Sequence, residues 1–161
     1  MLIVCTTQGC ISDDDPQGTA LQPGDSLPSF SATLTDGTVV SNTSLAGKVG
    51  VIVFFNTDCS DCRQELPVIQ QLYDRVSQNP DVVVAPIARA ESQDKIQQYW
   101  NDNGLSMPFS PQDNKDVYLL FAPSVIPRIF ISNRQGVITF SSGDTDMPDL
   151  DTLLAEIEKN L

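Results

Sequence analysis

The chain has 161 residues, 40% of them hydrophobic, which suits one globular domain with a short tail. Nine basic against 21 acidic residues give a net charge of −12 and leave no basic stripe that could neutralise the phosphates of nucleic acid. The same charge disfavours docking on anionic lipid head groups. The absence of histidine excludes a histidine-based catalytic triad and a mixed cysteine–histidine zinc site. No stretch approaches the roughly 20 apolar residues that span a bilayer.

The first 20 residues differ in composition from the rest. Residues 1–4 are apolar but few, and no basic residue precedes them, so they look like the remnant of a secretory signal. Cys10 follows a glycine and precedes an acidic tract at 12–15. This pattern resembles the lipidation site and acidic segment of Bacteroides-type surface lipoproteins. We expect residues 1–20 to be a signal remnant and acidic flexible tether, with Cys10 as a lipidation candidate. An acidic leader with incidental cysteines is the alternative.

Residues 21–161 contain alternating strand and helix patterns. Residues 30–40 predict a β-hairpin, because Asp36-Gly37 supplies the positive φ angles of its turn. The apolar run 49–55 predicts a central strand covered on both faces. The remaining elements follow from apolar periodicity. They are a helix starting near Cys59 and ending at Asn79, a strand at 82–87, helices at 92–103 and 116–121, strands at 128–131 and 137–140, and a helix at 149–161.

This order predicts an α/β fold of three layers. The strands at 49–55 and 82–87 are joined through a helix and should therefore be parallel. The last two strands are joined by a tight turn and should be antiparallel. Pro86 favours an edge position or an early end for its strand. The result is a mixed central sheet with an N-terminal hairpin and helices on both faces.

Cys59 and Cys62 form a C-x-x-C where a strand leads into a helix, which is the setting of reversible dithiol chemistry. We expect Thr57 or Asp58 to cap the helix. Cys59, nearer the helix start, is then the nucleophile that forms a mixed disulfide, and Cys62 resolves it. Neither half-reaction needs a metal or organic cofactor.

Residues 24–143 resemble the TlpA/ResA-type thiol–disulfide oxidoreductases of the thioredoxin superfamily. The matching features are, in chain order, the lead-in at 24–30, the hairpin turn at 36–37, the turn before the core strand at 45–48, the C-x-x-C segment at 55–62, and the proline, strand and turn at 125–136. The resemblance implies a thioredoxin-like domain over residues 21–161. It also implies that Pro127 is cis and faces the C-x-x-C, that the backbone of Ile126 docks a partner's chain, and that Glu65 exchanges a proton with Cys62.

Two residues depart from the family pattern. Asp58 stands where the family has tryptophan, and Asp61 stands where proline is common. Both carboxylates should lie beside the sulfurs and touch a bound substrate. Because nearby negative charge disfavours a thiolate, they predict a relatively reducing couple.

The sequence therefore predicts a cell-envelope thiol–disulfide oxidoreductase, acting as a reductant, in the periplasm or on an outer-membrane lipid anchor. Its partners would be protein thiols and disulfides and an upstream electron donor or acceptor. A thioredoxin-fold binding or chaperone-like module with a structural disulfide is one alternative. A peroxiredoxin-like peroxidase is another, although Asn56 and Ile52 stand where it needs threonine and proline.

Overall fold

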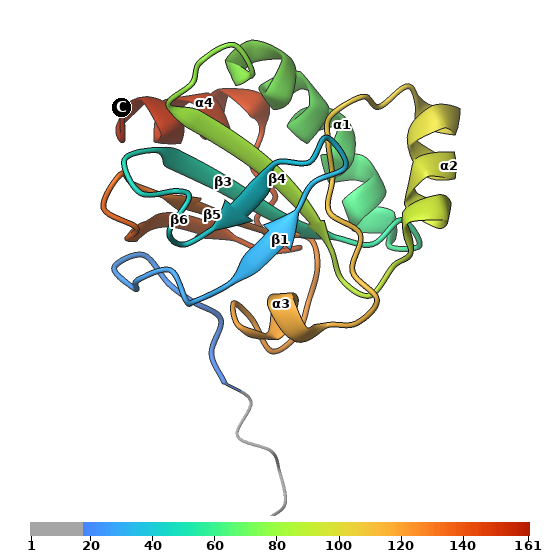
Figure 1. The fold of residues 1–161 in the computed structure, drawn as a ribbon, viewed down its shortest axis with the longest axis horizontal. Coiled ribbons are helices and arrows are strands. Elements are labelled where there is room, and N and C mark those ends of the chain that lie inside the picture. Colours follow the sequence, from blue (N-terminus) through green and yellow to red (C-terminus); the bar gives the residue numbers. More distant parts are fainter. Residues whose placement is uncertain (1–17) are drawn as a thin grey trace, which may run out of the picture.

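The computed structural model describes residues 18–161, and Figure 1 shows their arrangement. A four-stranded sheet forms the centre, with strand order β4-β3-β5-β6, and β1 and β2 form a separate two-stranded sheet. The strands are β1 (Ser31–Thr33), β2 (Val39–Ser41), β3 (Val49–Phe55), β4 (Val82–Ala88), β5 (Arg128–Ser132) and β6 (Ile138–Ser142). The helices are α1 (Ser60–Val76), α2 (Gln93–Asn103), α3 (Asp116–Leu119) and α4 (Leu150–Glu158).

The strand directions confirm the predicted mixed sheet. Strand β3 pairs with β4 in parallel and with β5 antiparallel, and β5 pairs with β6 antiparallel. Pro86 lies inside β4, which is an edge strand of this sheet. The carbonyl of Pro86 accepts a hydrogen bond of 2.8 Å from the backbone N–H of Ser110, so the outer side of β4 is partly covered.

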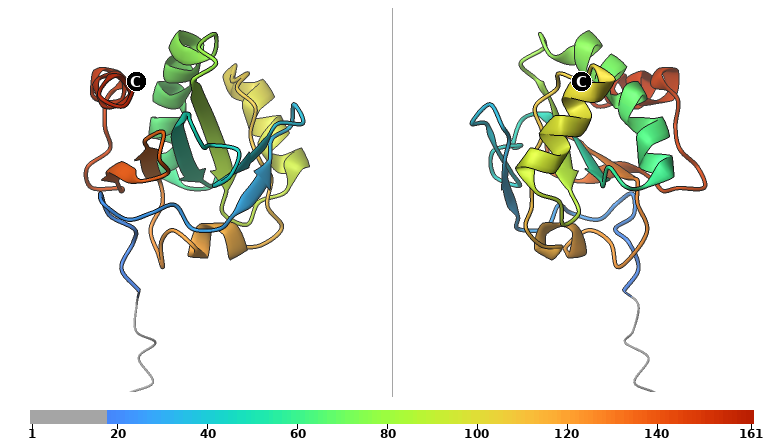
Figure 2. Two further views of the ribbon diagram at one scale, coloured as in Figure 1. Left: turned by 60° about the vertical axis from the view of Figure 1, so that its left-hand side comes forward. Right: turned by 90° about the vertical axis from the view of Figure 1, so that its right-hand side faces the viewer.

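The two faces of the sheet carry separate hydrophobic cores, because side chains alternate along β3. Val51, Val53 and Phe55 pack with residues of α1, α2 and α4. Ile52 and Phe54 pack with the β1–β2 hairpin and the region of α3. In Figures 1 and 2, α1 and α4 lie above the sheet and α3 lies below it. All seven residues of β3 are buried, as the continuous apolar run predicts.

Most of the predicted tether, including Cys10, lies outside the described residues. Ala20 is already buried, and the backbone N–H of Leu21 donates to the carbonyl of Phe121 over 2.8 Å. Within residues 18–161, no helix combines the length and the apolar character that crossing a membrane requires.

Candidate active site

Cys59 lies where β3 has ended and α1 begins. It is itself the N-cap residue of α1, and its sulfur accepts a hydrogen bond of 3.3 Å from the backbone N–H of Cys62. The predicted cap by Thr57 or Asp58 is therefore wrong. Their side chains are engaged elsewhere, because the Thr57 hydroxyl donates to the Glu91 carboxylate and the Asp58 carboxylate accepts from Lys95. Cys59 is partly exposed, so an incoming disulfide can reach its sulfur.

Cys62 differs from Cys59 in its exposure to solvent. It is fully buried, one turn into α1. Burial raises the pKa of the Cys62 thiol, and the neighbouring Cys59 sulfur and the negative charge of Asp61 raise it further. Cys62 therefore stays protonated while Cys59 meets solvent. This asymmetry suits an attacking sulfur at Cys59 and a resolving sulfur at Cys62.

The loop that precedes β5 contacts Cys59. The Ile126–Pro127 peptide bond is cis, as the resemblance implies. The Cys59 thiol donates to the carbonyl of Ile126 across 3.7 Å, so the loop and the sulfur are in contact. Val125 has a φ of 74°, and its carbonyl accepts a hydrogen bond of 2.7 Å from the Tyr118 hydroxyl. Tyr118, which the sequence did not single out, thus holds the loop in place.

Glu65 lies one turn beyond Cys62 on α1. Its side chain is only 3% exposed, and its Oε1 atom is buried without a hydrogen-bond partner. Burial raises the pKa of Glu65 to about 7. A carboxyl group with this pKa exchanges protons readily near neutral pH, and it shares a helix face with Cys62.

The carboxylate of Asp58 has a basic partner. It is exposed beside Cys59 and forms an ion pair with Lys95 of α2. The hydrogen bond from Lys95 lowers the pKa of Asp58, and the same bond raises the pKa of Lys95. Asp61, by contrast, has no ion-pair partner among the described residues. The two aspartates, treated alike from the sequence, have different surroundings.

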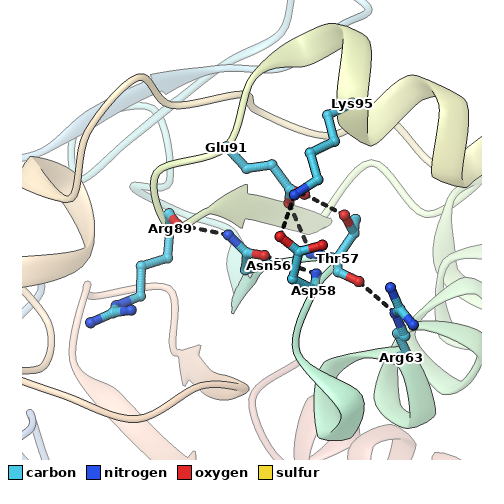
Figure 3. A network of polar contacts seen from close by, with 7 residues as sticks. All are labelled: Asn56, Thr57, Asp58, Arg63, Arg89, Glu91 and Lys95. Atoms are coloured by element: carbon cyan, nitrogen blue, oxygen red, sulfur yellow. Dashed lines mark hydrogen bonds and ion pairs between the residues drawn. The ribbon is translucent and has the colours of Figure 1, made fainter.

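Glu91 is a site residue that sequence reasoning missed. It lies between β4 and α2, is buried, and accepts hydrogen bonds from both the backbone N–H and the hydroxyl of Thr57, the former over 2.8 Å. The amide of Asn56 adds a bond to the carbonyl of Arg89 over 3.3 Å. Figure 3 shows these contacts at Asn56 and Thr57, which lie between β3 and α1. The only feature of the sequence that pointed to Glu91 was its spacing of four residues from Lys95 at the start of the predicted helix 92–103, a spacing at which side chains pair.

Among the described residues, no cluster of three or more cysteine, aspartate or glutamate side chains is arranged to hold a metal ion. A partly exposed thiol and a buried thiol lie at a helix start beside a mixed sheet, and the exposed one contacts a cis-proline loop. This arrangement defines a thiol–disulfide oxidoreductase of thioredoxin-like fold. The chain belongs to the Redoxin family, whose model matches residues 22–154.

Curated relatives and solved structures agree with this assignment. Thiol-disulfide oxidoreductase ResA of Bacillus thuringiensis is 22% identical over 131 residues, which are 81% of this chain and 73% of the relative. Thioredoxin-like protein YneN of Bacillus subtilis is 27% identical, covering 73% of this chain and 69% of its own. A candidate protein disulfide isomerase from Bacteroides thetaiotaomicron matches with a TM-score of 0.81 and 27% identity, over 90% of this chain and 93% of its own. The chain is TlpA/ResA-like.

Proposed function

We propose that this chain exchanges disulfides with protein partners through Cys59 and Cys62, and that it acts as a reductant. The observation that carries the proposal is the asymmetry of the two thiols. Cys59 is partly exposed, contacts the carbonyl of Ile126 in the loop of Pro127, and accepts a hydrogen bond from the backbone N–H of Cys62. Cys62, by contrast, is buried and protonated.

The reaction has two steps. The deprotonated sulfur of Cys59 attacks one sulfur of a partner's disulfide, forms a mixed disulfide and releases the other partner sulfur, which takes up a proton. Cys62 then loses its proton to Glu65 and attacks the sulfur of Cys59, and the second partner sulfur leaves as a thiolate that takes up a proton. The partner disulfide has become two thiols, and the two cysteines of this chain have become a disulfide. The backbone at Ile126 would align the partner's extended chain.

The proposed direction is supported by the two aspartates beside the cysteines and by the burial of Cys62. A dithiol is favoured over its disulfide when a thiolate is stabilised in the reduced state, which is what makes some relatives strong oxidants. Burial and the charge of Asp61 raise the pKa of the Cys62 thiol, so Cys62 supplies no thiolate that stabilises the reduced pair. The negative charge of Asp61 also disfavours a thiolate near it. Asp58 contributes less than the sequence suggested, because Lys95 offsets its charge. We expect a couple nearer about −270 mV than about −120 mV.

We further propose an extracytoplasmic location, at the cell envelope. The relatives named ResA and the resemblance of residues 9–15 to a lipoprotein signal support this. Cys10 would carry the lipid. Mass spectrometry of the mature protein from its native host tests the anchor, and an unmodified Cys10 in that protein would rule it out.

The test of the exchange reaction is trapping in the native host. Cys62→Ser should capture partners as mixed disulfides on Cys59, which a reductant releases and mass spectrometry identifies. The matched control carries Cys59→Ser as well and should capture none. Equal capture by both variants would contradict the proposal and favour a binding module. A redox titration of the intact pair tests the direction, and a potential near about −120 mV would refute it.

A further inference from the structure

Three charged residues beside Cys59 form what we call the charged cluster: Asp58, Lys95 and Glu91. Asp58 directly precedes Cys59 and its side chain is 69% exposed. Lys95 lies in α2, where its Nζ atom contacts the Asp58 carboxylate and lies 3.6 Å from Oε1 of Glu91. Figure 3 shows the ammonium group of Lys95 between the two carboxylates.

Glu91 fixes the position of Lys95. The Glu91 side chain is 2% exposed, and a buried carboxylate is costly unless donors surround it. Thr57 supplies two donors, through its N–H and its hydroxyl, and Lys95 supplies positive charge. The buried Glu91 carboxylate therefore holds the ammonium group of Lys95 from one side. On its other side, the ammonium group contacts the exposed Asp58 carboxylate.

If it were unpaired, the Asp58 carboxylate would place a negative charge beside the sulfur of Cys59. An attacking cysteine must carry negative charge, and a second negative charge next to it also repels disulfides in acidic surroundings. The Asp58–Lys95 pair lines a surface hollow of about 190 Å³ that also contains Arg63 and Tyr99. The guanidinium of Arg63 lies 5.6 Å from the centre of the Tyr99 ring. A partner whose disulfide meets Cys59 therefore passes close to this pair.

We propose that Lys95 is a specificity-determining residue of the dithiol site: it cancels the charge of Asp58 beside Cys59 and so admits disulfides that lie in acidic surroundings. This inference rests on the proposed function, because it takes Cys59 as the attacking sulfur. Glu91 is the positioning residue that holds Lys95. The family pattern has an aromatic residue at position 58, so this arrangement accompanies the aspartate of this chain.

The test uses three small symmetric disulfides that differ in charge: dithiodipropionate, which is anionic, hydroxyethyl disulfide, which is neutral, and cystamine, which is cationic. The full chain carries Cys62→Ser in every variant, so the reaction stops at one mixed disulfide. The sulfur of Cys59 bonds to one half of the probe, and the other half leaves as a thiolate that water protonates. Acid quenching and mass spectrometry of the peptide containing Cys59 give the rate constant.

Lys95→Met should lower the dithiodipropionate-to-cystamine rate ratio by roughly fivefold, as expected for an exposed charge beside the sulfur. Asp58→Asn should shift the ratio in the opposite direction. The double variant should return it to the parent value, and Lys95→Arg should preserve it. Lys115→Met, at an exposed lysine before α3, is the matched control and should leave the ratio unchanged.

Two results would overturn the inference. In the first, Lys95→Met slows all three probes equally, which means that the lysine is only structural. In the second, the double variant keeps the shifted ratio of Lys95→Met. If the parent forms no mixed disulfide at Cys59 with any probe, the proposed function itself fails, which is a distinct outcome.

Discussion

Glu65→Gln replaces a buried carboxyl group one turn beyond Cys62 with a neutral amide of the same shape. In the folded protein, burial raises the pKa of Glu65 to about 7, compared with an ordinary value of 4.5. The folded state therefore holds a proton on Glu65 that the unfolded state gives up between pH 4.5 and 7. The stability that accompanies this proton is fully present below pH 4.5 and is lost as the pH rises to about 7.

The size of this loss follows from the two pKa values. Each pKa unit corresponds to about 1.4 kcal/mol, so the full difference amounts to about 3 kcal/mol. Residual solvent screening reduces the expected effect to on the order of 2 kcal/mol. The free energy of unfolding of the parent protein should fall by this amount, relative to Glu65→Gln, between pH 4.5 and 7.5. Above pH 7.5, the difference between the two proteins should be constant.

Urea unfolding of both proteins in the reduced state, at steps across this pH range, measures the effect. Carboxyl groups other than Glu65 titrate in both proteins and cancel in the difference. Glu158→Gln, at an exposed glutamate of α4, is the matched control and should run parallel to the parent protein. Parallel pH curves for the parent and Glu65→Gln would refute the reasoning, because the carboxyl group would then ionise as freely in the folded state as in the unfolded state.

Three further substitutions test the contacts around the site by thermal or urea unfolding. Thr57→Val removes a hydroxyl that donates to the buried Glu91 carboxylate and should cost about 2 kcal/mol, and an unchanged stability would contradict that bond. Tyr118→Phe removes the donor to the Val125 carbonyl and should cost about 1 kcal/mol, and no loss would show that water replaces it. Gly50→Ala places a methyl carbon 2.8 Å from the hydroxyl oxygen of Ser132 on β5 and should cost about 2 kcal/mol, whereas full stability would mean that the Ser132 side chain moves aside without cost.

The parts of the fold that could be predicted are those that neighbouring residues determine. The run 49–55 is apolar throughout, and it forms β3, which is buried on both faces. Asp36-Gly37 gives the hairpin turn, where Gly37 has a φ of 88°. Gly104 ends α2 in the left-handed conformation that a glycine adopts without strain. In each case, the residues that make up the sequence pattern lie within a few positions of the structural element that the pattern predicts.

The parts of the site that could not be predicted depend on residues far apart in the sequence. Lys95 lies 37 residues after Asp58, and Glu91 lies 34 residues after Thr57. Nothing in the local sequence shows that the end of β4 and the start of α2 pack against the loop before Cys59. The prediction of the helix cap was wrong for the same reason, because the side chains of both predicted capping residues bind these distant partners.

The two aspartates beside the cysteines now have different consequences for the redox couple. Asp58 lies next to the attacking sulfur, but Lys95 pairs with it, so its charge is largely offset where a partner approaches. Asp61 has no ion-pair partner in the described part of the chain, and its charge raises the pKa of the buried Cys62 thiol. Cys62 therefore adds no thiolate that would stabilise the reduced pair. We expect the sulfur of Cys59 to attack a partner's disulfide readily, because Lys95 of α2 balances the negative charge of Asp58 beside it.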